Sequence, residues 1–491
     1  MKKSHLRQPV FSMYKRKRGY ITVFLSMVIA AMLIFIITLI EITRMQTIRF
    51  QIEGVMDIGL SSIFAEYHRE ILNRYGLLFI DTSYGTTVSN TSLTESHLLN
   101  YMNQNFEIPK TYLSEAKDLT MLHADNVTIN DKTYASDGFG EVLKYQIVKY
   151  MKMKEGISDI ENFMDSGFLY EESKRYEDYE SNRKKTEGKI EAILDEINRN
   201  KEESEEDITI ENPADEVNGK RSNPILEYAI SDDTCISNKS IILSDYISHR
   251  NYKQGNGLFS YQEKPNGVEE KLLFQKYLYG VCGCYGKIRD QSALDYQMEY
   301  LIYGKNNDFA NLEAFAKEIF ALRYVTNISY LFTDSGKQAQ AYELALAVTS
   351  GIMHPELAEA VKVTILFAWG YAESIQDMRI IFDGKKVGIV KNDANWNIEI
   401  SELLSFSGQL NSYHEDPTGE NYEGYLRKKL FIVDEKKLLI RLMDIMEMDI
   451  RKTAGNQNFK MDQCIYQLEA TVNVSSEYGY GFDITRRYSY Q

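Results

Sequence analysis

Residues 20–40 read YITVFLSMVIAAMLIFIITLI, an apolar run of 21 residues without a charged side chain. At a rise of about 1.5 Å per residue, a helix of this length crosses a hydrocarbon core of about 30 Å. Only a helix can satisfy its own backbone hydrogen bonds in that core. We therefore predict a single transmembrane helix over residues 19–42, preceded by a basic tail over residues 1–18.

The first eighteen residues carry seven lysines or arginines and no acidic residue. Positive residues are enriched on the cytoplasmic side of membrane helices. We expect Lys15, Arg16, Lys17 and Arg18 to hold the N-terminus in the cytoplasm. The predicted location is therefore the cell membrane, crossed once, with the lipid bilayer as a partner and everything from Glu41 onward extracellular.

A cleaved secretory signal is the alternative to a retained anchor, because it also begins basic and turns apolar. Signal cores span roughly 7–15 residues and end at a small-x-small cleavage site. The run is longer than this and leads into Glu41-Ile-Thr-Arg44-Met-Gln, which has no such site. A retained anchor is the favoured interpretation.

The helical pattern continues beyond the apolar run. Apolar residues recur near helical spacing at Met45, Ile48, Ile52, Val55, Leu60 and Ile63. No proline occurs between Tyr20 and Tyr75, and Gly76 provides a C-terminal stop. We expect one helix of about 56 residues, roughly 84 Å long, with its first half in lipid. Its amphipathic second half should pack against the ectodomain or a partner helix.

A basic stretch, a glycine and the apolar run follow one another in residues 16–25, RKRGYITVFL. This arrangement resembles the N-terminal helix of type IV pilins and of the pilin-like TadE and TadG proteins of tight-adherence (Tad, or Flp) pilus systems. Prepilin peptidases cut after such a glycine, so the resemblance implies a cleavage point between Gly19 and Tyr20. Prepilins and TadE usually carry a glutamate where this sequence has Phe24. That departure favours an uncleaved, TadG-like anchor, and an ordinary anchor with an incidental glycine is the alternative.

Four further segments resemble an uncharacterised family of Gram-positive, anaerobe-type membrane proteins, a domain of unknown function often encoded beside Tad pilus genes. They are residues 64–81 (FAEYHREILNRYGLLFID), 299–304 (EYLIYG), 369–374 (WGYAES) and 441–444 (RLMD). The similarity extends over most of the chain. It implies a location and a genetic context, but no catalytic residues, because the family has no established activity.

Composition divides the chain after the anchor into three parts. Residues 43–168 are predicted to form a first ectodomain part. Residues 169–224 form a charged helical arm and a flexible linker, since residues 170–206 hold 13 acids and 8 bases with few apolar residues. Residues 225–491 form the main ectodomain.

The main ectodomain mixes helical and strand patterns. Helical stripes occur around Leu312–Phe320, Leu357–Trp369 and Leu426–Ile445, and residues 378–400 have the pattern of a hairpin. Residues 468–474 alternate apolar and polar side chains, which predicts a strand paired with residues 482–490 across a turn at 478–481. The predicted fold class is α+β, without a βαβ rhythm.

The charge balance excludes one class of partner. Without the seven bases of the tail, 49 Lys and Arg stand against 71 Asp and Glu, a net charge of −22. Nucleic-acid binding needs a basic footprint, so no nucleic acid is expected as a partner. Solubility is the simplest meaning of such an acidic exterior.

The four cysteines are Cys235, Cys282, Cys284 and Cys464. In an extracytoplasmic compartment they permit two disulfides in any of three pairings, and free buried thiols are the alternative. Cys282-Gly-Cys284 is too short for the CxxC spacing of zinc or redox sites, so no metal site is predicted.

Catalytic motifs are missing from the sequence, including HExxH, GxSxG, the phosphate loop and the dinucleotide fingerprint. The best acidic cluster, His414-Glu415-Asp416 with Glu420, is interpreted as a solvated loop. Glu373 follows Trp369 by one helical turn and is interpreted as a satisfied core glutamate that needs a partner such as Arg379. No enzyme activity, catalytic residue or cofactor is predicted.

Two functions of different classes remain open. The favoured one is a membrane-anchored extracytoplasmic structural or assembly protein, TadE/TadG-like, of a tight-adherence pilus or cell-envelope system. Its partners would be other membrane or pilus-assembly proteins that contact the N-terminal helix, and it could form an oligomer. The alternative is a membrane-anchored enzyme or ligand-binding ectodomain unrelated to pili.

Overall fold

The computed structural model describes residues 17–88, 90–107, 120–154, 168–200, 207–230, 236–265, 267–352, 354–405 and 415–490. Its helices are α1 (Lys17–Phe64), α2 (Arg69–Tyr75), α3 (Ser92–Phe106), α4 (Asp137–Lys154), α5 (Phe168–Arg199), α6 (Pro213–Gly219), α7 (Ile225–Ala229), α8 (Val268–Val281), α9 (Gln297–Tyr303), α10 (Asp308–Thr333), α11 (Ser335–Val348), α12 (Pro355–Phe382), α13 (Tyr422–Ile432) and α14 (Glu435–Arg451). Its strands are β1 (Ile80–Asp81), β2 (Leu122–Tyr134), β3 (Cys464–Ser476) and β4 (Gly481–Ser489). The class is α+β, as predicted.

The long N-terminal helix is shorter than the sequence pattern predicts. α1 ends at Phe64 after 48 residues, and α2 is a separate helix. The break lies at His68, whose extended backbone caps α2 and whose Nδ1 accepts the N–H of Ile71. The backbone N–H of His68 donates to Phe79 at 2.8 Å, which fixes the turn. Gly76 ends α2 in the left-handed conformation, so the stop signal belongs to the second helix.

β3 is the central strand of a small antiparallel sheet. β2 lies along one edge of it, with Val127 opposite Val472. β4 lies along the other edge, with Ile484 opposite Val472, and β1 pairs with the first residues of β3. The predicted pairing of the last two strands across the turn at 478–481 is confirmed.

One hydrophobic cluster joins the second half of α1 to this sheet. The buried residues that α1 contributes are Ile48, Ile52, Val55, Met56, Leu60, Ile63 and Phe64. α3 adds Leu98, Met102 and Phe106, and alternate residues of β2 and β3 complete the cluster. We call α1 from Glu41 onward, α3, β2, β3 and β4 the sheet module.

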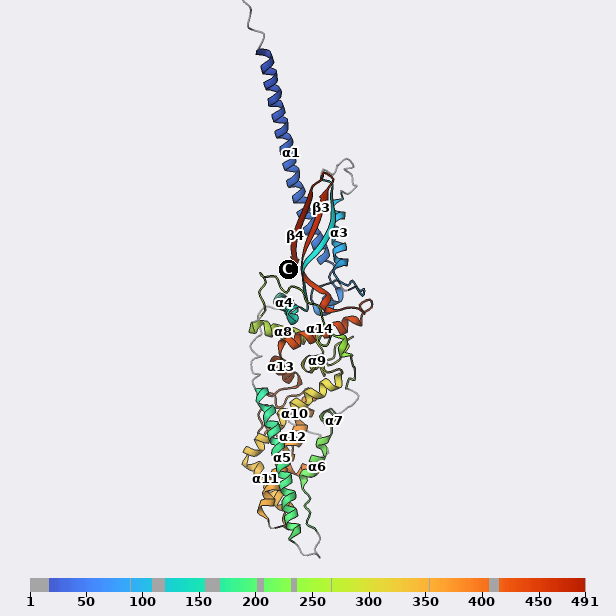
Figure 1. Ribbon diagram of the computed structural model, residues 1–491. Helices are drawn as coiled ribbons and strands as arrows, with labels where there is room; N and C mark the ends of the chain where they lie inside the picture. Colours follow the sequence, from blue (N-terminus) through green and yellow to red (C-terminus); the bar gives the residue numbers. More distant parts are fainter. Residues whose placement is uncertain are drawn as a thin grey trace, which may run out of the picture.

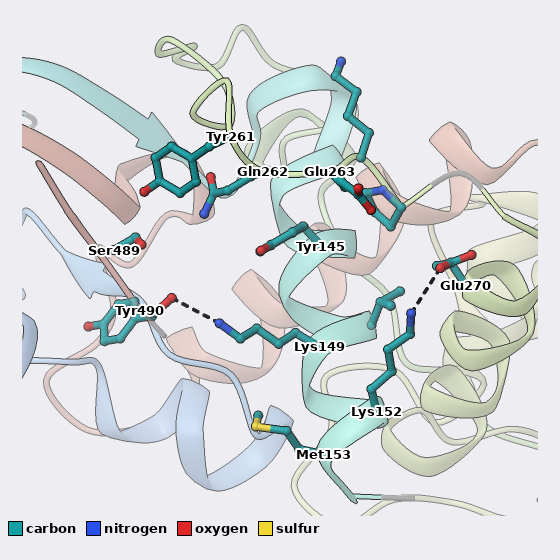
Figure 2. A pocket seen from close by; sticks show the side chains of 13 residues that line it. Tyr145, Lys149, Lys152, Met153, Tyr261, Gln262, Glu263, Glu270, Ser489 and Tyr490 are labelled. Atoms are coloured by element: carbon teal, nitrogen blue, oxygen red, sulfur yellow. Dashed lines mark hydrogen bonds and ion pairs between the residues drawn. The ribbon is translucent and has the colours of Figure 1, made fainter. Parts of the chain in front are cut away.

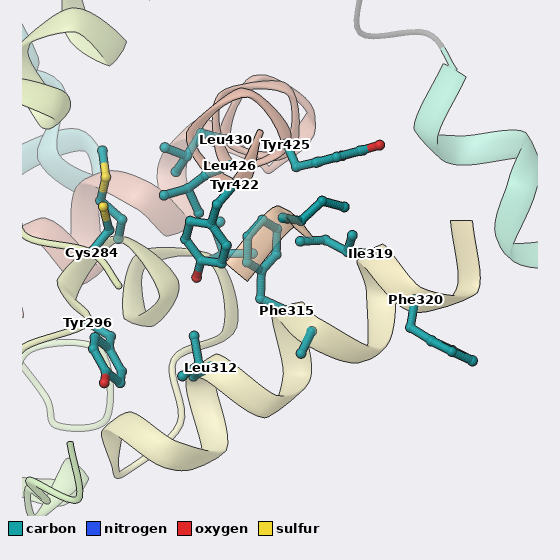
Figure 3. Packing of buried hydrophobic residues seen from close by; sticks show 14 of the residues in the cluster. Cys284, Tyr296, Leu312, Phe315, Ile319, Phe320, Tyr422, Tyr425, Leu426 and Leu430 are labelled. Carbon is teal, nitrogen blue, oxygen red and sulfur yellow. The ribbon is translucent and has the colours of Figure 1, made fainter. Parts of the chain in front are cut away.

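The described residues between β2 and β3 are inserted into the sheet module. Together with α2 and residues 77–79 they form a second, larger cluster. Figure 1 shows these helices extending away from the module, first α4, α8 and α14, then α10, α12, α5 and α11 at the far end. The predicted helical stripes are buried in this core. Figure 3 shows one contact, where Leu312, Phe315 and Ile319 of α10 face Tyr422 and Leu426 of α13.

Two expectations in this region are wrong. The charged segment after residue 168 is α5, but it is no free arm, because it lies against α10 and α12 with Ile190 and Ile193 buried. The described part of the expected linker contains α6, whose Pro213, Ala214 and Val217 are buried. Asn212 caps this helix by accepting the N–H of Ala214, and Pro213 follows it in the first turn, where proline is favoured.

The expected hairpin over residues 378–400 is also wrong. α12 continues to Phe382, because Met378, Ile380 and Ile381 extend its buried face. Residues 383–399 then form an irregular loop with no strand among them. Charged side chains under this loop hold it against α12.

Candidate functional site

The first half of α1 projects beyond the rest of the protein (Figure 1), and no part of its apolar stretch is buried within the protein. Its large apolar side chains are almost all exposed, and they are Tyr20, Ile21, Val23, Phe24, Leu25, Met27, Ile29, Met32, Leu33, Ile34, Phe35, Ile36, Ile37, Leu39, Ile40 and Ile42. Water-exposed apolar surfaces of this size are rare in soluble proteins. Within the described part of the chain, α1 is the one helix long and apolar enough to cross a membrane, and a signal sequence meets the same test.

Hydroxyl groups inside this half bond to the helix itself. Thr22 Oγ1 donates to Gly19 O at 2.9 Å, Ser26 Oγ to Val23 O at 2.8 Å and Thr38 Oγ1 to Ile34 O at 2.8 Å. These bonds lower the cost of placing a hydroxyl in hydrocarbon.

The sequence-predicted topology and cleavage residues lie at the start of α1. Gly19 and Tyr20 are in the first turns of the helix, with open space around Gly19 and Tyr20 exposed. Lys17 and Arg18 begin the same helix, but their side chains lie outside the described residues, as do Lys15 and Arg16 entirely. The uncleaved anchor, which Phe24 favours over cleavage after Gly19, stays a prediction.

A network of side chains marks the end of the apolar half. Glu41 is the first charged residue after the run, and Arg44 donates to its carboxylate at 3.1 Å. The hydroxyl of Tyr480, in the β3–β4 turn, donates to Glu41 as well. The guanidinium of Arg44 lies over the ring of Tyr478 at 4.3 Å from the centroid. The turn therefore contacts α1 at the point where its apolar surface stops.

Glu66 holds the other end of α1 to α3. Its carboxylate accepts from Tyr101 Oη at 2.6 Å and Tyr84 Oη at 2.7 Å, and His97 Nδ1 lies 3.0 Å away. Burial raises the pKa of Glu66, but these hydrogen bonds outweigh burial and leave the pKa below its usual range. The rest of the sheet module is thus fixed to α1 near both ends of the part of the helix that it contacts.

Four charged side chains are buried together between α10, α12 and the loop after α12. Lys391 Nζ lies 2.5 Å from Glu373 Oε1 and 2.7 Å from Asp377 Oδ1. Arg323 Nε donates to Asp377 Oδ2 at 3.0 Å. All four side chains have at most 1% of their surface exposed. We call Arg323, Glu373, Asp377 and Lys391 the buried charge cluster.

Backbone groups of the loop complete this cluster. Glu373 accepts the N–H groups of Asn397 and Ile398, and Arg323 donates to the carbonyl of Gly388. Burial raises the pKa of Glu373, and the positive charge of Lys391, which lowers the pKa, only partly offsets this rise. For Asp377, Arg323 and Lys391 outweigh burial and lower its pKa. Glu373 is a satisfied core glutamate, as predicted, and its cationic partner is Lys391, which the sequence pattern did not indicate.

A cavity of about 760 Å³ lies between α4, residues 261–265 and the end of β4 (Figure 2). Tyr145, Tyr261 and Tyr490 line it together with Lys149 and Lys152. Lys149 Nζ donates to Tyr490 O at 3.4 Å, and burial lowers its pKa. The lining also contains Glu263 and Glu270, and Lys152 Nζ lies 3.2 Å from Glu270 Oε1. A lining of hydroxyl groups, cations and carboxylates suits a polar or amphipathic ligand.

The acidic cluster expected at residues 414–420 is divided among separate partners. His414 lies outside the described residues. Asp416 accepts both the N–H and the hydroxyl of Thr418, and Glu420 pairs with Lys428 at 3.1 Å. Among the described residues, no group of three or more His, Cys, Asp or Glu side chains could hold a metal ion.

Three of the four cysteines are described, and all three are buried free thiols, Cys282, Cys284 and Cys464. The described cysteines form no disulfide with one another, and Cys235 lies outside the described residues. Burial raises the pKa of Cys282 to about 12 and raises the pKa of Cys284 and Cys464 further. These thiols are therefore protonated at neutral pH.

Iodoacetamide is expected to leave Cys282, Cys284 and Cys464 unmodified in the folded protein, because the thiolate is the reactive form and none is accessible. Peptide mass spectrometry after a short exposure measures this. The same protein in concentrated urea, where all three should react, is the control. Rapid modification of any of them under native conditions would contradict the buried assignment.

Comparison with known proteins gives one match. The sequence profile of a family of unknown function, DUF5702, matches residues 201–476, which is more than half of the 491 residues. No curated protein and no solved structure matches the chain. The matched range contains α6 to α14 and β3, whereas α1 lies outside it.

Proposed function

The chain belongs to the DUF5702 family, and we propose that it is a structural or assembly protein anchored in the cell membrane by α1, with its other domains outside the cell. The proposed system is a TadE/TadG-like part of a tight-adherence pilus or of the cell envelope. The uncharacterised family supplies no activity, so the proposal depends on architecture. Its link to pili depends on the resemblance of residues 16–25.

The observation that carries the proposal is the division of α1 at Glu41. Before this residue none of the apolar side chains is buried in the described part of the protein, and after it the same helix is built into the sheet module. A signal sequence that is removed would need no such continuity with a folded core. Cleavage within 20–40 would also separate the module from the helix turns that precede Glu41.

Beyond the anchor, α1 keeps a second exposed face that supports helix association. Phe50 is 79% exposed and Ile58 is 51% exposed, on the side away from the sheet. Gly54 lies between them, with open space where a side chain would be. A helix face with both large and small residues can pack closely against another helix. Such van der Waals packing also holds helices together within lipid. We propose that this face contacts the helix of another membrane or pilus-assembly protein.

The first test is membrane retention of the full chain. Replacing both Ile29 and Ile36 with arginine should release the protein from membranes on alkaline carbonate extraction, because each buried arginine costs about 2.5–3.5 kcal/mol at the centre of a span. The matched control replaces Phe50 and Ile58 with arginine on the same helix and should stay in the membrane. External protease should digest the wild-type ectodomain in intact protoplasts.

Release of the wild-type protein, or protection of its ectodomain, would contradict the anchor. The Phe50→Arg, Ile58→Arg variant also tests the assembly role. It should stay anchored but lose cross-links to partner helices from a photoreactive residue at Met45. Unchanged cross-links would remove helix association from the proposal.

The cavity of about 760 Å³ is the observation that favours the alternative, a ligand-binding ectodomain. Loss of surface pili on deletion of the gene in its native host, restored by the wild-type gene, would support the assembly role. Restoration by a variant with Tyr145→Ala and Lys149→Ala would show that the assembly role does not need this cavity. Failure of that variant, when it folds normally, would support the ligand-binding alternative.

A further inference from the structure

The β3–β4 turn has a fixed shape and points in the same direction as the apolar half of α1 (Figure 1). Ser476 donates its N–H to Tyr480 O at 2.9 Å, and Gly479 donates to Ser476 O at 2.8 Å. Gly479 has φ +85°, which a glycine adopts without strain. Glu477 donates to Met121 O at 3.1 Å, so the start of β2 is attached to the same turn.

The contacts with α1 place this turn at a defined level along the helix. Tyr480 bonds to Glu41, and Tyr478 lies against Arg44. Arg44 is four residues after Ile40, the last residue of the apolar run, which is about 6 Å along the helix axis. The headgroup layer extends about 5–8 Å beyond the hydrocarbon core on each side. If α1 spans the bilayer with residues 20–40, the turn lies in that layer.

The exposed side chains of the turn suit this layer. Tyr478, in the turn, is 42% exposed, and Met121, the residue before β2, is 38% exposed. The ring of Phe482 lies 6.5 Å from that of Tyr480. Tyrosines are enriched where membrane proteins cross from hydrocarbon to water, because the ring is apolar and the hydroxyl polar. Arg44 adds a cation at the level of the lipid phosphates.

We propose that the β3–β4 turn, residues 477–480, is a second membrane contact of the ectodomain and inserts Tyr478 among the phospholipid headgroups. This inference rests on the proposed anchoring of α1. A lipid surface is favoured over a protein partner because the exit of α1 already brings the bilayer to this level. Two contacts on one bilayer restrict the tilt of the sheet module, which a single helix leaves free.

The test uses tryptophan reporters in the full chain, reconstituted in vesicles of phosphatidylcholine and phosphatidylglycerol. The native Trp369, in α12, and Trp396, in the loop after α12, are buried and give a constant background. Tyr478→Trp reports on the turn and Met121→Trp reports on the neighbouring strand. Tyr342→Trp, on the exposed surface of α11, is the matched control, and Phe35→Trp reports on the span.

Lipids with a quencher near the headgroup should quench Tyr478→Trp at least twofold more strongly than Tyr342→Trp. Lipids with a quencher deep in the acyl chains should quench Phe35→Trp most. If Phe35→Trp is quenched while Tyr478→Trp and Met121→Trp behave like Tyr342→Trp, the turn does not contact lipid and the inference is wrong. If Phe35→Trp itself is not quenched, the anchor fails and the inference fails with it.

Discussion

Replacing Lys391 with methionine is expected to destabilise the far helices by about 3–5 kcal/mol, the usual cost of removing one partner of a buried ion pair. Lys391 is the cation between Glu373 and Asp377, and its side chain has no exposed surface. Without Lys391, Asp377 still pairs with Arg323, but Glu373 accepts hydrogen bonds only from uncharged donors. The carboxyl of Glu373 must then take up a proton or remain an unpaired charge.

The chain carries its own reporter for this experiment. Its two tryptophans, Trp369 and Trp396, pack edge to face at 5.6 Å, and Lys391 Nζ lies 5.7 Å from the ring of Trp396. Urea unfolding of the detergent-solubilised protein, followed by tryptophan fluorescence, therefore reports on these helices. Lys386→Met, at an exposed position of the same loop, is the control and should change stability by less than about 0.5 kcal/mol.

A double variant separates loss of charge balance from loss of packing. Lys391→Met combined with Glu373→Gln removes one charge of each sign and leaves the pair of Arg323 and Asp377. It should recover about half of the stability lost by Lys391→Met alone. A single variant as stable as the wild type would show that the cluster does not hold residues 383–399 in place.

Replacing Glu299 with glutamine is expected to make the protein more stable at pH 8 but not at pH 4.5. Glu299 is fully buried in α9, where Oε1 accepts from Tyr285 N–H and Tyr422 Oη and Oε2 has no hydrogen-bond partner. Burial raises its pKa to about 7. Figure 3 shows Tyr422, the donor to Glu299, among buried hydrophobic residues of the core.

The sign follows from proton binding. In the unfolded chain the carboxyl ionises near pH 4.5, and in the folded protein near pH 7. Between these values the folded state holds a proton that the unfolded state has released, so stability falls as pH rises from about 4.5 to about 7. The difference in pKa corresponds to about 3 kcal/mol. Glutamine does not ionise, so residue 299 of the variant does not lower the stability as the pH rises.

Unfolding free energies of wild type and variant, measured in urea at several pH values, test the prediction. Glu447 has its pKa raised by burial to about 7 as well, so the comparison must be the difference between two proteins rather than one curve. Glu356→Gln, at an exposed glutamate, is the control. Equal pH dependence of wild type and Glu299→Gln would contradict a buried carboxyl that titrates in this range.

The long apolar N-terminal helix and the core stripes could be predicted from sequence because they depend on local patterns. An apolar run needs no partner to be identified, and the stripes of α10, α12 and α14 follow helical periodicity. The break at His68 was missed because it depends on a hydrogen bond to Phe79, a residue after the next helix. The extent of α12 was missed because the turn signals at Asp383 and Asn392 outweighed the buried face of residues 378–382.

The buried charge cluster and the sheet module depend on contacts that sequence spacing does not encode. Lys391 follows Asp377 by 14 residues and reaches it only because the loop folds back onto α12. β2 pairs with β3 although Val127 and Val472 are separated by more than 300 residues. Dividing the chain into consecutive parts, with boundaries at 168 and 224, could not place the last strands beside the first.

That long-range pairing has a consequence for synthesis. During synthesis α1, α3 and β2 are complete long before β3 and β4 are translated. The apolar face that these elements share stays uncovered until β3 and β4 are made, while the inserted helices can already fold among themselves. A nascent chain that stops short of residue 464 therefore exposes the apolar faces of α1 and α3. Chaperones and proteases that recognise exposed apolar surface would bind such an incomplete chain.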